Sequence, residues 1–63
     1  MDTKKTGAYL AALRKARGMT QQEAADQLGV SNKTVSKWEN GAGLPDITVL
    51  PALAELYGVT ADD

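Results

Sequence analysis

The 63-residue chain contains no cysteine, no histidine and no phenylalanine. The absence of cysteine excludes disulfides and thiolate metal sites, and the absence of histidine removes the commonest metal ligand and general base. The chain also has no glycine-rich phosphate-binding loop, so nothing in it pairs a nucleophile with a base. We therefore expect no enzyme activity, no catalytic residues, no cofactor and no bound metal.

Long apolar runs are missing as well. No run approaches the roughly 20 residues that a helix needs to span a bilayer, and the start of the chain does not resemble a signal peptide. We therefore expect no membrane contact and a cytoplasmic location. The apolar content of 43% is ordinary for a globular protein, and the length suits one small domain.

Basic residues are absent from residues 39–63. All seven lysines and arginines lie in residues 1–38 together with three of the eight acids, which gives that part a net charge of +4. The other five acids give residues 39–63 a net charge of −5. The overall charge of −1 therefore conceals a basic part that can offer a positive face to phosphate. Ordinary solubilising charge is the alternative explanation.

Capping residues and glycines divide the chain into four predicted helices, which cover residues 7–17, 21–28, 32–40 and 48–57. The predicted N-caps are Thr6, Thr20, Ser31 and Thr48. Glu23 follows Thr20 by three residues and completes a capping-box pattern. Pro51 has no N–H to donate and belongs in the first turn of a helix, which favours a start at Thr48 over one at Asp46.

These helices predict one all-α domain, a compact bundle over residues 6–63. Residues 1–5 are expected to form a mobile N-terminal arm, and Thr60 is placed to cap a fifth helix. Only the tetrapeptide Leu-Gly-Val-Ser separates the second and third helices, and a connection this short is typical of a helix-turn-helix unit. The predicted core consists of Leu10, Leu13, Met19, Ala25, Leu28, Val30, Val35, Trp38, Leu44, Ile47, Leu50, Leu53 and Leu56.

The third predicted helix has one apolar face and one polar face. Val35 and Trp38 share the apolar face, which we expect to be buried. The opposite face carries Asn32, Lys33, Ser36 and Lys37. Asparagine forms two hydrogen bonds to adenine and lysine donates to guanine, so these residues suit the major groove of DNA. The alternative, which these residues leave open, is that this polar face is only solvated and binds no ligand.

The segment TQQEAADQLGVSNKTVSKWENG at residues 20–41, followed by LPDITVLPALAELYGV at residues 44–59, resembles the lambda-repressor-like helix-turn-helix family of bacterial and phage regulators. The preceding segment LRKARGMTQQE fits the same pattern, and the similarity runs from about Thr6 to Val59. The resemblance implies a lambda-repressor-like fold whose second and third helices form the helix-turn-helix. It also implies sequence-specific binding of double-stranded DNA, with residues 32–40 in the major groove.

The resemblance further implies roles for individual side chains. The base-reading positions are occupied by Asn32, Lys33, Ser36 and Lys37. The phosphate-contacting positions are occupied by Gln21, Gln22, Thr34 and Asn40. Arg14 and Glu39 match a pair that the family uses as an internal salt bridge between the first and third helices. Family members commonly bind inverted repeats as dimers, so the expected partners are operator DNA and, weakly, a second copy of the chain.

Two departures from the family pattern are visible. The loop GAGLPD after the third helix has no basic residue, which implies fewer phosphate contacts and a stronger dependence on dimerisation. Ala24 stands where the family usually has leucine. Two further interpretations stay open: an antitoxin-like protein-interaction module that uses the acidic residues 39–63, and an engineered variant of the fold that binds nothing.

Overall fold

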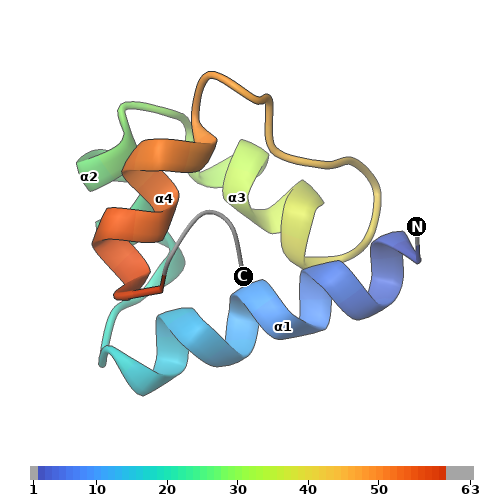
Figure 1. The fold of residues 1–63 in the computed structure, drawn as a ribbon, viewed down its shortest axis with the longest axis horizontal. Helices are drawn as coiled ribbons and strands as arrows, with labels where there is room; N and C mark the ends of the chain where they lie inside the picture. The colour runs from blue at the N-terminus through green and yellow to red at the C-terminus, as the bar shows by residue number, and fades with distance from the viewer. Residues whose placement is uncertain (1, 60–63) are drawn as a thin grey trace.

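A computed structural model describes residues 2–59, and this part of the chain forms four helices and no strand. They are α1 (Thr3–Ala16), α2 (Gln21–Leu28), α3 (Asn32–Glu39) and α4 (Leu50–Tyr57). Figure 1 shows α1 along the lower side, α3 above it, and a long loop that leads from α3 to α4. Helix α3 packs on both α1 and α2, and α4 packs on α2. The predicted all-α bundle is confirmed, whereas the fifth helix predicted at Thr60 lies outside the described residues.

Helix α1 begins earlier than predicted. The carboxylate of Asp2 accepts hydrogen bonds from the N–H groups of Lys4 at 3.0 Å and Lys5 at 3.1 Å, and so caps the helix. Thr6 therefore lies inside α1 and is not its N-cap. Residues 3–5, which were expected in an N-terminal arm, form the first turn of the helix. Aspartate is at least as good an N-cap as threonine, and the earlier cap adds a turn of hydrogen bonds.

Helix α4 begins at Leu50 with Val49 in the cap position, so the prediction that Thr48 is the N-cap is wrong. Thr48 instead donates to the carboxylate of Asp46, through its N–H at 3.1 Å and its hydroxyl at 3.2 Å. The N–H of Val49 donates to the Asp46 carbonyl at 2.9 Å. Asp46 thus caps a separate turn ahead of α4, because its side chain offers acceptors to a following N–H. Pro51 lies in the first turn, as predicted.

The core contains side chains from all four helices. Its buried members are Leu10, Ala24, Ala25, Val35, Trp38, Leu53 and Tyr57. The predicted core residues that are partly buried against them are Leu13, Met19, Leu28, Val30 and Leu56. The assignment of Leu44, Ile47 and Leu50 to the core is wrong, because they are 45%, 78% and 41% exposed. They lie in the loop and at the first position of α4, where helical periodicity does not indicate which side faces inward.

The described part of the chain has neither a membrane-spanning helix nor a cluster of metal ligands. None of the helices within residues 2–59 is long and apolar enough to cross a lipid bilayer. The same residues contain no group of three or more acidic, cysteine or histidine side chains arranged to hold a metal ion.

Candidate nucleic-acid interface

Helices α2 and α3 are joined by a short turn whose ends are fixed by local hydrogen bonds. Thr20 Oγ1 accepts from the N–H of Glu23 at 3.1 Å, and the Glu23 carboxylate accepts from the N–H of Thr20 at 2.9 Å, so the predicted capping box is present. Ser31 Oγ accepts from the N–H of Thr34 at 3.1 Å and caps α3 as predicted. Gly29 ends α2 with a φ of 72°, a left-handed conformation that glycine adopts without steric cost. The sequence thus encodes this helix-turn-helix locally.

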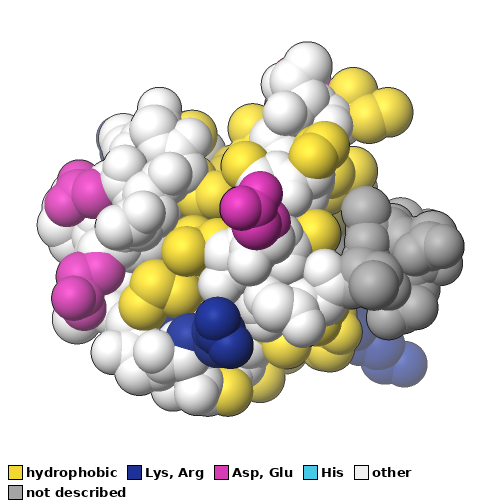
Figure 2. Space-filling view, turned by 60° about the vertical axis from the view of Figure 1, so that its left-hand side comes forward, with side chains coloured by type: hydrophobic (Ala, Val, Ile, Leu, Met, Phe, Trp, Pro, Cys, Tyr) yellow, Lys and Arg dark blue, Asp and Glu magenta, His cyan; other side chains and the backbone are white. Residues whose placement is uncertain are grey.

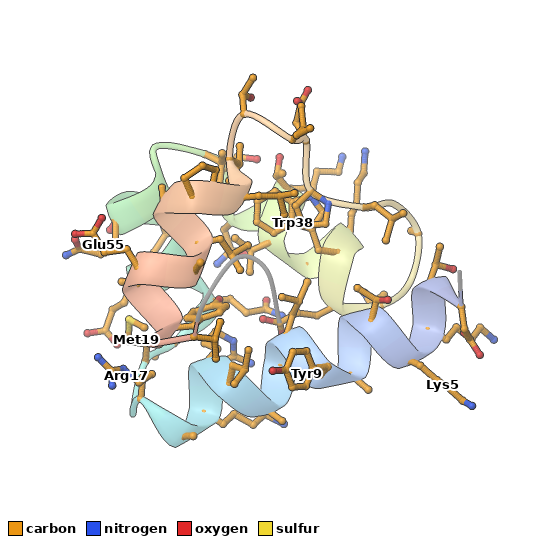
Figure 3. All side chains as sticks on the ribbon, viewed as in Figure 1. Lys5, Tyr9, Arg17, Met19, Trp38 and Glu55 are labelled. Carbon is orange, nitrogen blue, oxygen red and sulfur yellow. The ribbon has the colours of Figure 1, made fainter. Side chains whose placement is uncertain are left out.

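Helix α3 buries its apolar face and exposes its polar face. Val35 is only 1% exposed, and Trp38, which is labelled in Figure 3, is 6% exposed. The residues of the predicted base-reading set that are exposed are Asn32, Lys33 and Lys37. Neither lysine forms an ion pair with an acid in residues 2–59. Amide and ammonium groups therefore project from one side of a helix whose other side is anchored in the core.

Ser36 and Asn40 lie one turn apart at the end of α3. Ser36 is half-buried, and its hydroxyl accepts a hydrogen bond from Nδ2 of the exposed Asn40 at 3.3 Å. At the other end of the helix, the hydroxyls of Thr34 and Ser31 are 2.9 Å apart. These bonds hold the side chains in place without using all of their hydrogen-bonding capacity. Thr34 and Ser36 are half-buried and Asn40 is exposed, so all three side chains remain partly accessible to solvent.

The two glutamines at the start of α2 are held by different acids. Gln21 Nε2 donates to Glu39 Oε1 at 3.0 Å, and Gln22 Nε2 donates to Asp26 Oδ1 at 2.8 Å. Gln21 is half-buried, whereas Gln22 is exposed. Their backbone N–H groups have no acceptor within residues 2–59. The N-terminus of α2 therefore keeps free backbone donors and the positive end of the helix dipole, which suit an anion.

Arg14 and Glu39 form the predicted ion pair between α1 and α3. Arg14 Nε donates to Glu39 Oε2 at 2.8 Å, and a second guanidinium nitrogen, Nη2, donates to Oε1 at 3.0 Å. The remaining nitrogen, Nη1, donates to the carbonyl of Met19 at 2.7 Å. The two charged side chains are only 10% and 6% exposed. Removal of either partner would leave an uncompensated charge in the interior, which is strongly destabilising.

The pair favours the ionised form of both groups. Burial raises the pKa of the Glu39 carboxyl, but the hydrogen bonds from Arg14 and Gln21 outweigh it, and the net pKa lies below the ordinary value. The hydrogen bond to Glu39 raises the pKa of Arg14. Burial and then the nearby charge of Glu39 raise the pKa of Tyr57. The centre of the bundle therefore holds a fixed ion pair beside a neutral phenol.

Lys4 is a candidate that sequence reasoning missed, since it was assigned to the arm. The structure places it against the loop that follows α3, where a Cβ built on Gly41 would lie 2.9 Å from Lys4 Cγ. Lys4 is exposed, and it adds a basic residue beside a loop that has none of its own. Lys5, in contrast, extends from the side of α1 away from α3 in Figure 3. The feature of the sequence that could have revealed Lys4 is Asp2, because Asp2 caps α1 and makes residues 3–5 helical.

A different surface lies over α2 and α4. Figure 2 shows acidic side chains and a basic side chain beside an apolar strip on this side of the molecule. Asp26 of α2 and Glu55 of α4 are both exposed. A shallow hollow in this region is lined by Gln27, Ala52, Glu55 and Leu56. This surface thus combines exposed charged side chains with apolar ones.

Comparisons with known proteins bear on this arrangement. A family model described as helix-turn-helix matches residues 10–63. The chain is 39% identical to the HTH-type transcriptional activator BcrR of Enterococcus faecalis, over 86% of this chain and 26% of BcrR. It is 30% identical to the uncharacterized HTH-type transcriptional regulator YazB of Bacillus subtilis, over 100% of this chain and 91% of YazB.

A solved structure is similar over nearly the whole fold. The crystal structure of the restriction-modification controller protein C.AhdI from Aeromonas hydrophila matches with a TM-score of 0.87 and 26% identity, over 97% of this chain and 88% of that chain. The chain spans about a quarter of the length of BcrR and about half that of two other curated relatives. The similarity therefore covers one domain of several longer proteins.

Proposed function

Because the chain belongs to the lambda-repressor-like helix-turn-helix family, we propose that it binds double-stranded DNA sequence-specifically, as the DNA-binding part of a transcriptional regulator. The role is one of binding and not of catalysis. BcrR and YazB are transcriptional regulators by name, which supports this assignment. Such a protein acts where the DNA is, so we propose the cytoplasm as its location.

One observation carries the proposal: α3 buries Trp38 and exposes Lys33 and Lys37. A helix anchored in this way can enter the major groove without loss of core contacts. Asn32, Lys33 and Lys37 then read base edges, and the half-buried Ser36 completes the base-reading set. Gln21, Gln22, Thr34 and Asn40 contact phosphates on either side of the groove, together with the free N–H groups of α2.

Glu55 of α4 lies away from the duplex in this arrangement, because phosphate repels carboxylate. Two copies bind an inverted repeat whose half-sites lie about one helical turn, or 34 Å, apart. The copies associate weakly in the absence of DNA. The absence of basic residues from the loop at 41–46 makes the second half-site important for affinity.

Selection from a random duplex pool, performed at two salt concentrations, tests the proposal. We expect an enriched inverted repeat, and an affinity that falls with salt by a logarithmic slope of about 0.9 for each phosphate neutralised. Failure to enrich any sequence, together with salt-independent binding, would contradict the proposal.

A second candidate function is a protein-interaction module of the antitoxin-like kind. The hollow between Gln27, Ala52, Glu55 and Leu56 favours it, because the acidic Glu55 lies there beside the apolar Ala52 and Leu56. Capture of a basic protein partner that persists after nuclease treatment would support this function. The two functions use different surfaces and are compatible with each other.

A further inference from the structure

The carboxylate of Glu39 joins three helices. Glu39 ends α3, accepts two hydrogen bonds from Arg14 of α1, and accepts a third from Gln21 Nε2 of α2 at 3.0 Å. Its side chain is only 6% exposed, whereas Gln21 is half-buried at the surface. A buried carboxylate thus contacts the first residue of α2, at the end of the helix where we place a phosphate.

The contact fixes the orientation of the Gln21 amide. A carboxylate is only an acceptor, so the NH₂ end of the amide faces Glu39 and the oxygen faces away. An NH₂ group has two N–H bonds, and Glu39 uses one of them. The second N–H of Gln21 remains, close in sequence to the backbone N–H groups of Gln21 and Gln22 that have no acceptor within residues 2–59.

The charge of Glu39 does not repel a phosphate from this position, because Arg14 neutralises it through two hydrogen bonds. Gln22 provides the contrast within the same turn of helix. Its amide donates to Asp26, which is exposed and forms no ion pair with a residue in the described range 2–59. Only Gln21 is held by an acid that is both buried and neutralised.

We infer that Glu39 is a positioning residue for DNA binding, which holds the Gln21 amide so that its second N–H donates to a DNA phosphate. The inference rests on the proposed function. It assigns Glu39 a role in addition to the bridge between α1 and α3, because the amide of Gln21 loses its fixed orientation when the carboxylate is removed.

A double-mutant cycle tests the coupling. The probe is the duplex enriched from the random pool, and its dissociation constant is measured for wild type, Glu39→Gln, Gln21→Met and the double variant. We expect Glu39→Gln to weaken binding about three- to tenfold in the wild-type background, the effect of one hydrogen bond. In the Gln21→Met background the same substitution should change affinity by less than about twofold.

Gln22→Met is the matched control, since Gln22 does not contact Glu39. Glu39→Gln should weaken binding by the same factor in the Gln22→Met background as in wild type. Equal losses in the Gln21→Met and wild-type backgrounds would overturn the inference, because Glu39 would then act without Gln21. Absence of binding by the wild-type protein would instead refute the proposed function, and the wild-type titration is performed first for that reason.

A second measurement does not depend on the folding of Glu39→Gln, which leaves Arg14 unpaired. The two side-chain N–H protons of Gln21 are followed by NMR during titration of wild type with the same duplex, and Gln21→Met assigns them. We expect one proton to be protected from exchange before DNA is added and the other to shift on binding. If neither proton shifts when the protein is saturated, Gln21 does not donate to phosphate and the inference is wrong.

Discussion

Gly7 of α1 lies directly against the backbone carbonyl of Glu39 on α3. A Cβ built on Gly7 would be 2.7 Å from that oxygen and would also overlap the carbonyl oxygen of Trp38. The two helices therefore cross with their backbones in contact, which glycine alone permits. Arg14 lies two turns further along the buried face of α1, and the close crossing brings it within reach of Glu39.

Gly7→Ala is expected to destabilise the fold by about 1–3 kcal/mol, because the added methyl meets backbone atoms that cannot move aside without separating α1 from α3. Urea denaturation measures the change in the free energy of unfolding. Gly43→Ala is the control, since a Cβ at Gly43 meets nothing within 4 Å and should change stability by less than about 0.5 kcal/mol. Equal stability of the two variants would show that the helices cross further apart than described.

Trp38→Ala is expected to leave the chain largely unfolded. Truncation of a buried tryptophan costs about 3–5 kcal/mol, and a domain of this length has about 3–9 kcal/mol of total stability. Circular dichroism should show reduced helix content and a weakened or absent thermal transition. Tyr9→Ala serves as control, because Tyr9 is 56% exposed and its truncation should leave the transition nearly unchanged. A cooperative transition near the wild-type temperature in Trp38→Ala would contradict the assigned core.

Lys33→Ala is expected to relax sequence preference at one position of the binding site, with a loss of about 1–3 kcal/mol on the preferred sequence. The measurement is a second selection from the random pool with the variant protein. Lys5→Ala is the control, because Lys5 points away from α3 and should leave the enriched sequence unchanged. An unchanged preference in Lys33→Ala would mean that α3 is not placed as proposed.

Lys4→Ala tests whether the residue next to Gly41 contacts phosphate. We expect weaker binding to all sequences alike, and a salt slope that is smaller in magnitude by about 0.9, the value for one lost phosphate contact. The dissociation constant is measured at several salt concentrations. A slope equal to that of wild type would place Lys4 away from the DNA backbone.

Stability should fall on acidification as Glu39 is protonated. The pKa of Glu39 in the folded protein lies below its ordinary value, so the unfolded chain binds the proton first. The contribution is fully present above the ordinary glutamate pKa of about 4.3 and is lost as the pH falls through the lower folded value. Urea denaturation between about pH 6 and pH 3 measures it. Glu39→Gln should show a shallower decline over that range, and a decline as steep as that of wild type would assign the effect to other carboxyls.

The sequence by itself determined the helix-turn-helix and the two faces of α3. The capping box of Thr20 and Glu23, the Ser31 cap and the alternation of Val35 and Trp38 with polar residues all depend on neighbours within about four positions. Interactions of this range form in any context that allows a helix, so the pattern in the sequence and the structure agree. The family resemblance supplied the pairing of residues 14 and 39, which no local rule gives.

The starts of α1 and α4 differ from those predicted from the sequence. At α1, Asp2 caps the helix in place of Thr6, because its carboxylate accepts from the N–H groups of Lys4 and Lys5. At α4, Val49 holds the cap position without a side-chain hydrogen bond, and Asp46 caps a separate turn ahead of the helix. Which residue acts as the cap depends on whether the rest of the fold can accommodate the longer helix or the extra turn.

Only the tertiary structure decided which distant groups meet. Gln21 and Glu39 are 18 residues apart, and Lys4 and Gly41 are further apart still, so their contacts depend on how α1, α2 and α3 cross. The exposure of Ile47 follows from the path of a loop without periodicity. Local rules specify each helix and its faces, but the angle and distance between helices come from side-chain packing across the whole core.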